Sequence, residues 1–155
     1  MTHGDGGWPS PSSQTALHAP PALQLSGIHH VAIIASDYAR SRRFYTEVLG
    51  LQVVSEVYRA ERQSHKLDLQ LPDGAQIELF SFPRPPARAS YPEACGLRHL
   101  ALRVADLDAS LKVLVLHGVA AEPVRLDPLT GAPFTFIADP DGLPIELVGP
   151  AERRD

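Results

Sequence analysis

Two histidines and two glutamates recur at matching places in an internal repeat of this chain. The segment GIHHVAIIASD at 27–37 recurs as GLRHLALRVAD at 96–106, which aligns His30 with His99. Further along, PDGAQIEL at 72–79 recurs as PDGLPIEL at 140–147, which aligns Glu78 with Glu146. Imidazole and carboxylate groups are ligands of borderline divalent metals. The repeat therefore predicts a pseudosymmetric metal site made of two histidines and two glutamates.

Each copy of the repeat has the pattern of a βαβββ module. A short apolar strand ends at an aspartate, Asp37 or Asp106, whose carboxylate is suited to cap the free amides of a helix. Apolar side chains at helical spacing then follow until a glycine, Gly50 or Gly118, where a left-handed residue can end the helix. Three more strands are predicted in each module, at 52–58, 66–71 and 76–82 in the first and at 121–125, 134–138 and 144–148 in the second. An Asp-Gly pair, at 73–74 and at 141–142, marks the hairpin turn before each glutamate strand.

Strand alternation places the histidines and glutamates on one side of the predicted sheet. In the first strand Val31 and Ile33 fall on the face opposite His30, and its copy in module two alternates in the same way. The glutamate strands divide likewise, with aliphatic side chains opposite Glu78 and Glu146. An aliphatic face suits packing against the two helices. The predicted class is therefore α+β, with a curved mixed sheet whose other face surrounds a metal cavity.

The same alternation identifies further residues that are predicted to line this cavity. Module one contributes a lysine and an aspartate at the positions that phenylalanines occupy in module two, and two more phenylalanines share the face of Glu78. Basic side chains on this face are candidate anchors for a substrate anion. A pocket that is half aromatic and half polar is typical of small-molecule sites. The predicted substrate contacts are Arg103, Lys66, Asp68, Phe80, Phe82, Phe134 and Phe136.

Each candidate also has a structural interpretation. A single strand histidine is more often a hydrogen-bonded core residue than a metal ligand, and a single strand glutamate is usually solvated. The repeat favours the metal interpretation, because all four side chains share a face and each has a counterpart. For Arg103 and Lys66, a solvated charge on the rim is an equally good interpretation. His29 falls on the opposite face and is expected to be structural, while His65 and His117 have no counterpart in the repeat.

Composition sets broad limits on the class of protein. The chain has 155 residues, 44% of them hydrophobic, which is enough for one ordinary core. Its formal net charge of −4 gives no reason to expect nucleic acid or an anionic membrane surface as a partner. No apolar run reaches the roughly 18 to 20 residues of a spanning helix, and the single cysteine, Cys95, fits a reducing compartment. We therefore expect a cytoplasmic protein with a small-molecule partner.

The predicted domain begins after a segment of different composition. Residues 1–26 are rich in Gly, Pro, Ser and Ala and have no periodic apolar pattern, so they are predicted to form a disordered tail. Residues 27–150 are predicted to form one domain, with module one at about 27–83 and module two at about 96–150. Residues 151–155 are predicted to be a second, short tail.

Several motifs together resemble the vicinal oxygen chelate superfamily. They are HHVAI at 29–33 with an aspartate seven residues after His30, a Phe-Tyr pair at 44–45, a Leu-Gly pair at 49–50 and DPDGLPIEL at 139–147. Within it the chain is similar to bacterial glyoxalase I, and more similar to a glyoxalase-like, bleomycin resistance-like subfamily whose substrate is not established. SEVYR at 55–59, IELFSFP at 77–83 and PEACGLRH at 92–99 resemble that subfamily. The resemblance covers about residues 27–148 and implies the paired-module fold that glyoxalases share with bleomycin resistance proteins and dioxygenases.

The resemblance also implies a cofactor and a reaction. One divalent metal ion per site would be held by His30, Glu78, His99 and Glu146, and this ligand set suits nickel, cobalt, zinc or manganese. Such a metal chelates adjacent substrate oxygens and stabilises an enediolate, while a displaced glutamate moves the proton. Glu146 is the implied catalytic base by analogy with glyoxalase I, and Glu78 is its pseudosymmetric competitor. The implied enzyme is a metal-dependent lyase or isomerase of the glyoxalase I type that acts on a hemithioacetal or a similar chelating substrate.

Two positions depart from bacterial glyoxalase I. Ile34 stands where that enzyme has an arginine that holds a glutathione carboxylate, and Phe82 stands where it has an asparagine. Both changes remove polar contacts with glutathione, so efficient lactoylglutathione lyase activity is not expected. The alternatives, in order, are a thiol-transfer or epoxide-opening resistance enzyme, an extradiol-type dioxygenase and a non-catalytic small-molecule binding protein. The site could close within one chain or across a homodimer.

Overall fold

The computed structural model describes residues 22–151 and contains two βαβββ modules in chain order. Module one consists of β1 (His30–Ala35), α1 (Tyr38–Arg43), η1 (Phe44–Val48), β2 (Gln52–Arg59), η2 (Ala60–Arg62), β3 (Ser64–Gln70) and β4 (Gln76–Ser81). Module two consists of β5 (Leu100–Arg103), α2 (Leu107–Leu116), β6 (Arg125–Leu126), β7 (Pro133–Ala138) and β8 (Pro144–Val148). The predicted α+β class and the paired modules are confirmed.

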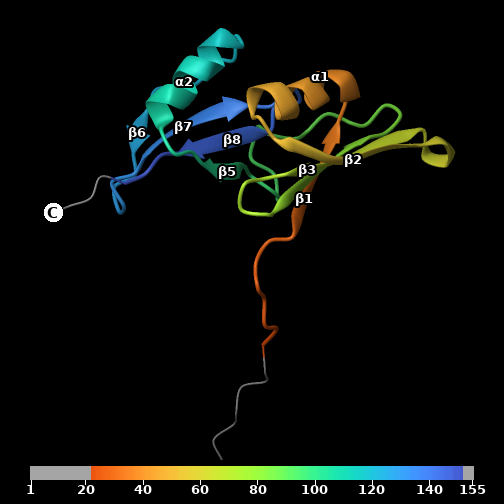
Figure 1. Cartoon of the computed structure of the whole chain (residues 1–155), viewed down its shortest axis with the longest axis horizontal. Coiled ribbons are helices and arrows are strands. Elements are labelled where there is room, and N and C mark those ends of the chain that lie inside the picture. Colours follow the sequence, from red (N-terminus) through yellow and green to blue (C-terminus); the bar gives the residue numbers. More distant parts are fainter. Residues whose placement is uncertain (1–21, 152–155) are drawn as a thin grey trace, which may run out of the picture.

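Each module forms its own mixed four-stranded sheet. The strand orders are β1-β4-β3-β2 and β5-β8-β7-β6, so the two sheets have the same topology. The first strand of each module pairs in parallel with the last, and the other pairings are antiparallel. Both helices lie on the same side of the two sheets (Figure 1). The opposite face of each sheet is therefore the face that helices leave uncovered.

The alternation of side chains follows the sequence pattern. Ile33 and Ala35 of β1 are buried, as are Ile77 and Leu79 of β4, whereas His30 is exposed and Glu78 is half-buried. Module two repeats this pattern, with aliphatic residues of β8 buried on either side of Glu146. Because the aliphatic face packs against the helices, each histidine and glutamate is directed to the uncovered face.

The predicted caps and turns are confirmed. The Asp37 carboxylate accepts a hydrogen bond from the Arg40 amide at 3.0 Å, and the Asp106 carboxylate accepts one from Ala109 at 2.9 Å. The Asp-Gly pairs at 73–74 and 141–142 form the turns that lead into β4 and β8. Gly74 has a φ of 91°, a left-handed conformation that favours glycine over residues with a Cβ.

Two predicted elements differ from the structure. The first helix changes to a π-helical turn at Phe44–Val48, where the hydroxyl of Thr46 donates to the Arg42 carbonyl and competes with the backbone amide. The strand predicted at 121–125 is reduced to Arg125–Leu126. Glu122 does donate its amide to Phe136, but Pro123 has no amide to continue the ladder.

Polar contacts join the two modules at the turn before β8. The Tyr45 side chain is fully buried, and its hydroxyl donates to Asp139 of that turn at 2.8 Å. The neighbouring Asp141 carboxylate accepts hydrogen bonds from the amide and hydroxyl of Ser36, at the end of β1. These contacts fix the start of the strand that carries Glu146 against module one.

The ends of the chain lie mostly outside the described residues. The predicted disordered tail at 1–26 is described only from residue 22, and residues 22–26 are exposed and belong to no helix or strand. Of the predicted tail at 151–155, only Ala151 is described. Among residues 22–151, no helix is both long enough and apolar enough to cross a membrane.

Candidate metal centre and substrate cavity

Module one brings His30 and Glu78 together on the uncovered face of its sheet. Ala32 pairs with Glu78 across β1 and β4, so His30, two residues earlier, shares the face of the carboxylate. His30 Nε2 lies 3.7 Å from Glu78 Oε2. The sequence placed His29 on the other face, but its ring turns toward His30, with the two Nδ1 atoms 2.9 Å apart. His29 precedes the first paired residue of β1, where strand alternation no longer fixes its direction.

Lys66 and Asp68 extend this pair into a polar cluster on β3. Asp68 lies directly opposite Glu78 in the ladder, and the Lys66 ammonium lies 3.0 Å from Glu78 Oε1 while also donating to Asp68. Hydrogen bonding to Asp68 raises the pKa of Lys66 above its ordinary value, and this outweighs the opposing effect of burial. Burial disfavours charge on Asp68, yet hydrogen bonds from Lys66 and Ser55 hold its pKa below the ordinary value. Module one therefore presents a charged, hydrogen-bonded half-site.

Module two brings His99 and Glu146 together in the equivalent place. His99 Nε2 lies 3.1 Å from Glu146 Oε2. Phe136 pairs with Glu146 in the ladder, as Asp68 pairs with Glu78, and its ring meets the His99 ring edge-on at a centroid distance of 5.3 Å. The alignment of Phe136 with Asp68 is therefore confirmed by the strand register. Module two presents an aromatic half-site in which a phenylalanine replaces the polar neighbour.

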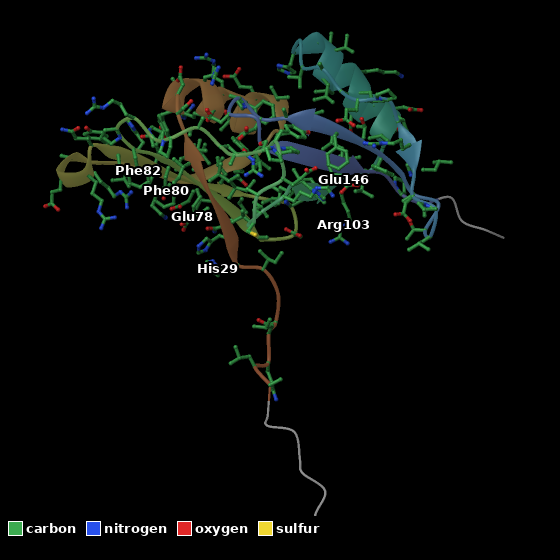
Figure 2. All side chains as sticks on the ribbon, turned by 180° about the vertical axis from the view of Figure 1, so that it is seen from behind. His29, Glu78, Phe80, Phe82, Arg103 and Glu146 are labelled. Carbon is green, nitrogen blue, oxygen red and sulfur yellow. The ribbon has the colours of Figure 1, made fainter. Side chains whose placement is uncertain are left out.

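The two His–Glu pairs lie on separate sheets. Glu78, with Phe80 and Phe82 near it, belongs to module one, whereas Glu146 and Arg103 belong to module two (Figure 2). Within residues 22–151, no three His, Cys, Asp or Glu side chains lie close enough together to hold a metal ion. The described part of one chain thus supplies two half-sites with one imidazole and one carboxylate each.

The aromatic substrate candidates surround the half-sites. Phe80 and Phe82 stack at a centroid distance of 6.1 Å beside Glu78, and the Arg59 guanidinium lies 5.0 Å from the Phe80 ring centre. In module two, Phe134 and Phe136 meet edge-on at 6.2 Å. Arg103 is exposed on β5, and strand alternation puts it on the same face of the sheet as His99. Whether these side chains contact a substrate remains a prediction.

A cavity of about 190 Å³ opens beside His99. Its walls come from the segment between β4 and β5 and from module two: Arg88, Ala89, Ser90, Tyr91, Glu93, Ala94, Arg98, His99, Glu122, Arg125, Phe136 and Pro144. The arginines of this cavity were not predicted as site residues from the sequence, and residues 84–95 were not assigned to any helix or strand. Arg125 could have been found, because it lies opposite Phe134 in the β6–β7 ladder and is a basic residue next to a predicted aromatic contact.

His65, the histidine of module one without a counterpart, takes part in a separate cluster. Its ring stacks on Tyr38 of the first helix at a centroid distance of 4.1 Å. The Tyr38 hydroxyl donates to Glu56, which also accepts from Arg42. Burial and the hydrogen bond to Glu56 raise the pKa of Tyr38 above its ordinary value. This cluster joins the helix to the sheet edge and is structural.

Comparison with known families identifies the fold. The model of the glyoxalase/bleomycin resistance protein/dioxygenase superfamily matches residues 27–147. The chain belongs to this superfamily. The family named from the motifs is thereby confirmed.

Members of the superfamily with high similarity have no assigned activity in their names. The uncharacterized protein YwkD of Bacillus subtilis is 57% identical over 125 residues, covering 81% of this chain and 98% of that protein. The uncharacterized protein YaeR of Escherichia coli is also 57% identical, covering 81% of this chain and 97% of that protein. The crystal structure of a glyoxalase family protein from Enterococcus faecalis is 47% identical, has a TM-score of 0.73 and covers 79% of this chain and 97% of its own.

More distant superfamily members carry names of activities. A 2-epi-5-epi-valiolone epimerase from an Actinomyces species is 29% identical and covers 78% of each chain. A probable lactoylglutathione lyase from Vibrio cholerae is 27% identical, covering 78% of this chain and 88% of that protein. The superfamily thus contains relatives of this chain named as a lyase and as an epimerase.

Proposed function

We propose that this chain is a divalent-metal-dependent lyase or isomerase of the glyoxalase I type. The observation that supports it best is the repeated pairing of His30 with Glu78 and of His99 with Glu146 on the uncovered faces of two equivalent sheets. Metal–ligand bonds of about 2.0–2.2 Å place neighbouring octahedral ligands roughly 3 Å apart. The His99–Glu146 distance of 3.1 Å matches that separation, and the His30–Glu78 distance of 3.7 Å is somewhat longer.

Both half-sites are needed for a four-ligand centre, and a second copy of the chain is proposed to complete it. The pairs do not converge within residues 22–151. Exposed apolar side chains lie on the uncovered face of module one, among them Ile34 on β1 and Val57 on β2. Large apolar side chains that are exposed in one chain suit burial at an interface. We therefore propose a homodimer in which module one of one chain faces module two of its partner.

The side chains of the site suit proton transfer next to a carbonyl. A divalent metal in this centre would supply Lewis-acid stabilisation of an enediolate. Glu146 is the proposed base, because it lies among apolar neighbours with only His99 within ion-pair distance among the described residues. Glu78 is held in place by the Lys66 ammonium at 3.0 Å. This asymmetry favours Glu146 as the group that moves the proton and Glu78 as a fixed ligand.

The proposed substrate is a small molecule with two adjacent oxygens, such as a hemithioacetal. Relatives named as a probable lactoylglutathione lyase and as an epimerase support a lyase or isomerase.

A metal-reconstituted activity screen tests the proposed function. The full chain is stripped of metal, reloaded separately with nickel, cobalt, zinc or manganese, and assayed with hemithioacetals formed from methylglyoxal and a panel of thiols. We expect turnover that depends on the metal and falls by about 10²–10⁴ in Glu146→Gln, the usual contribution of a general base. Metal-independent turnover, or equal rates in Glu146→Gln, would contradict the proposal. A carboxylate outside both half-sites, Glu61→Gln, is the matched control.

A further inference from the structure

The cavity beside His99 combines small size with a concentration of arginines. Its volume of about 190 Å³ is below the roughly 300–1,000 Å³ of pockets that hold a whole ligand. It therefore suits one substituent of a larger molecule. Three of its lining residues are arginines, Arg88, Arg98 and Arg125, and two are glutamates, Glu93 and Glu122. Its fixed charge is positive even when His99 is neutral.

The glutamates compensate two of these arginines and leave the third uncompensated. Arg125 lies 2.7 Å from Glu122, and Arg98 lies 3.9 Å from Glu93. Arg88 instead donates to neutral groups, namely the Ser90 hydroxyl and two backbone carbonyls of residues 97 and 98. In the part of the chain that the structure describes, no carboxylate lies within ion-pair distance of Arg88.

A difference between the two modules explains how Arg88 is placed. In module one the Gln76 amide donates to the His29 carbonyl at 3.0 Å, which continues the ladder between the first and last strands. The repeat aligns Gln76 with Pro144 and His29 with Arg98. Pro144 has no amide to donate, and the Arg98 carbonyl accepts from the Arg88 guanidinium at 3.0 Å instead. Both Pro144 and Arg88 line the cavity. The Arg88 side chain therefore takes the position at the Arg98 carbonyl that the strand amide occupies in module one.

Arg125 connects the cavity to the half-site of module two. Its guanidinium lies 5.1 Å from the Phe134 ring centre and 5.4 Å from that of Phe136, an arrangement that fixes the plane of the cation. Phe136 in turn contacts the His99 ring. A planar guanidinium binds carboxylate or phosphate through two parallel hydrogen bonds. Only the Phe136 ring would thus separate an anion bound to Arg125 from His99, a proposed metal ligand.

We propose that this cavity is an anion subsite that binds a carboxylate or phosphate substituent of the substrate through Arg88 and through the nitrogens of Arg125 that Glu122 does not contact. The assignment rests on the proposed function insofar as the anion belongs to the substrate of the metal centre. This cavity includes neither Arg103 nor Lys66, the two candidate anchors from the sequence. Substrates with a terminal acid group are therefore the class to examine first.

Calorimetric titration of the full chain with inorganic phosphate, and separately with malonate, tests the subsite. Both metal-loaded and metal-stripped protein are used, so that an anion held by the metal is separated from one held by arginine. We expect binding of at least one anion without metal, weakened by about 10-fold or more in Arg125→Gln and in Arg88→Gln. Arg62→Gln, at an exposed arginine of η2 outside the cavity, is the matched control and is expected to bind like the unmodified chain. The preferred anion distinguishes a phosphate from a carboxylate substituent.

Two outcomes overturn the subsite. One is the absence of anion binding to metal-stripped protein, and the other is unchanged binding in both Arg125→Gln and Arg88→Gln. Circular dichroism verifies folding, and if one variant does not fold, the other decides. Metal content is measured on the same samples. Anion binding without any metal uptake would contradict the proposed function but not the subsite. Metal uptake without anion binding would contradict the subsite but not the proposed function.

Discussion

Glu78→Ala is expected to lower the affinity of the chain for a divalent metal by at least about 10-fold. Loss of a residue that only supports a ligand already costs about 10- to 100-fold in affinity, and loss of a ligand itself costs more. Glu78 lies beside His30 and is held by Lys66, so its removal also leaves the ammonium without one of its two carboxylate partners. Competition against a chromophoric chelator measures the affinity, and elemental analysis after dialysis measures the retained metal.

The matched control for this change is Glu61→Ala. Glu61 is an exposed glutamate in the β2–β3 hairpin, away from either His–Glu pair, and its removal is expected to leave metal affinity unchanged. If Glu78→Ala retains as much metal as Glu61→Ala does, Glu78 is not a ligand and the four-ligand centre is wrong.

The glutathione hemithioacetal of methylglyoxal is expected to be a poor substrate. Ile34, at the position of the glutathione-binding arginine in bacterial glyoxalase I, is 54% exposed on the uncovered face of β1, and its aliphatic side chain cannot pair with a carboxylate. Phe82, at the position of an asparagine, stacks on Phe80 and offers no hydrogen bond. We expect kcat/KM to lie at least about 10²-fold below 10⁶ M⁻¹s⁻¹, a value well within the usual enzyme range.

A gain-of-function variant provides the counterpart of this prediction. Introducing Ile34→Arg together with Phe82→Asn is expected to improve turnover of the glutathione adduct by about 10-fold or more, since one charge-assisted hydrogen bond contributes about 1.5–3 kcal/mol. Steady-state kinetics on both proteins make the comparison. Efficient turnover by the unmodified chain would mean that other residues hold glutathione and that Ile34 and Phe82 do not exclude it.

Each His–Glu pair could be predicted from the sequence because strand periodicity is a local property. Ala32 pairs with Glu78 and Ala101 pairs with Glu146, as the repeat requires, and this register sets each histidine beside its glutamate. The caps at Asp37 and Asp106 were equally local, because each needs only a carboxylate three residues before an amide. The fold class followed from the same repeat.

The relation between the two half-sites and the arginine cavity could not be predicted in this way. Whether His30 meets His99 depends on how two sheets are placed, and no periodic pattern records that placement. Arg88 belongs to a segment without helix or strand, and its guanidinium contacts the Arg98 carbonyl, which Pro144 of β8 leaves without an amide donor. Arg125 ended the strand predicted at 121–125, but its place beside Phe134 and Phe136 depends on how β6 pairs with β7, which a strand pattern alone does not fix.

Mixing two complementary double variants tests most directly whether the proposed metal centre is shared between two chains. One variant carries His30→Ala and Glu78→Ala, the other carries His99→Ala and Glu146→Ala, and the heterodimer is purified through two different affinity tags. Neither homodimer should retain metal. The heterodimer should bind one divalent ion, because one of its two sites has all four native ligands and the other has none. A heterodimer without metal, in samples where the unmodified chain binds it stoichiometrically, would contradict a centre formed by module one of one chain and module two of its partner.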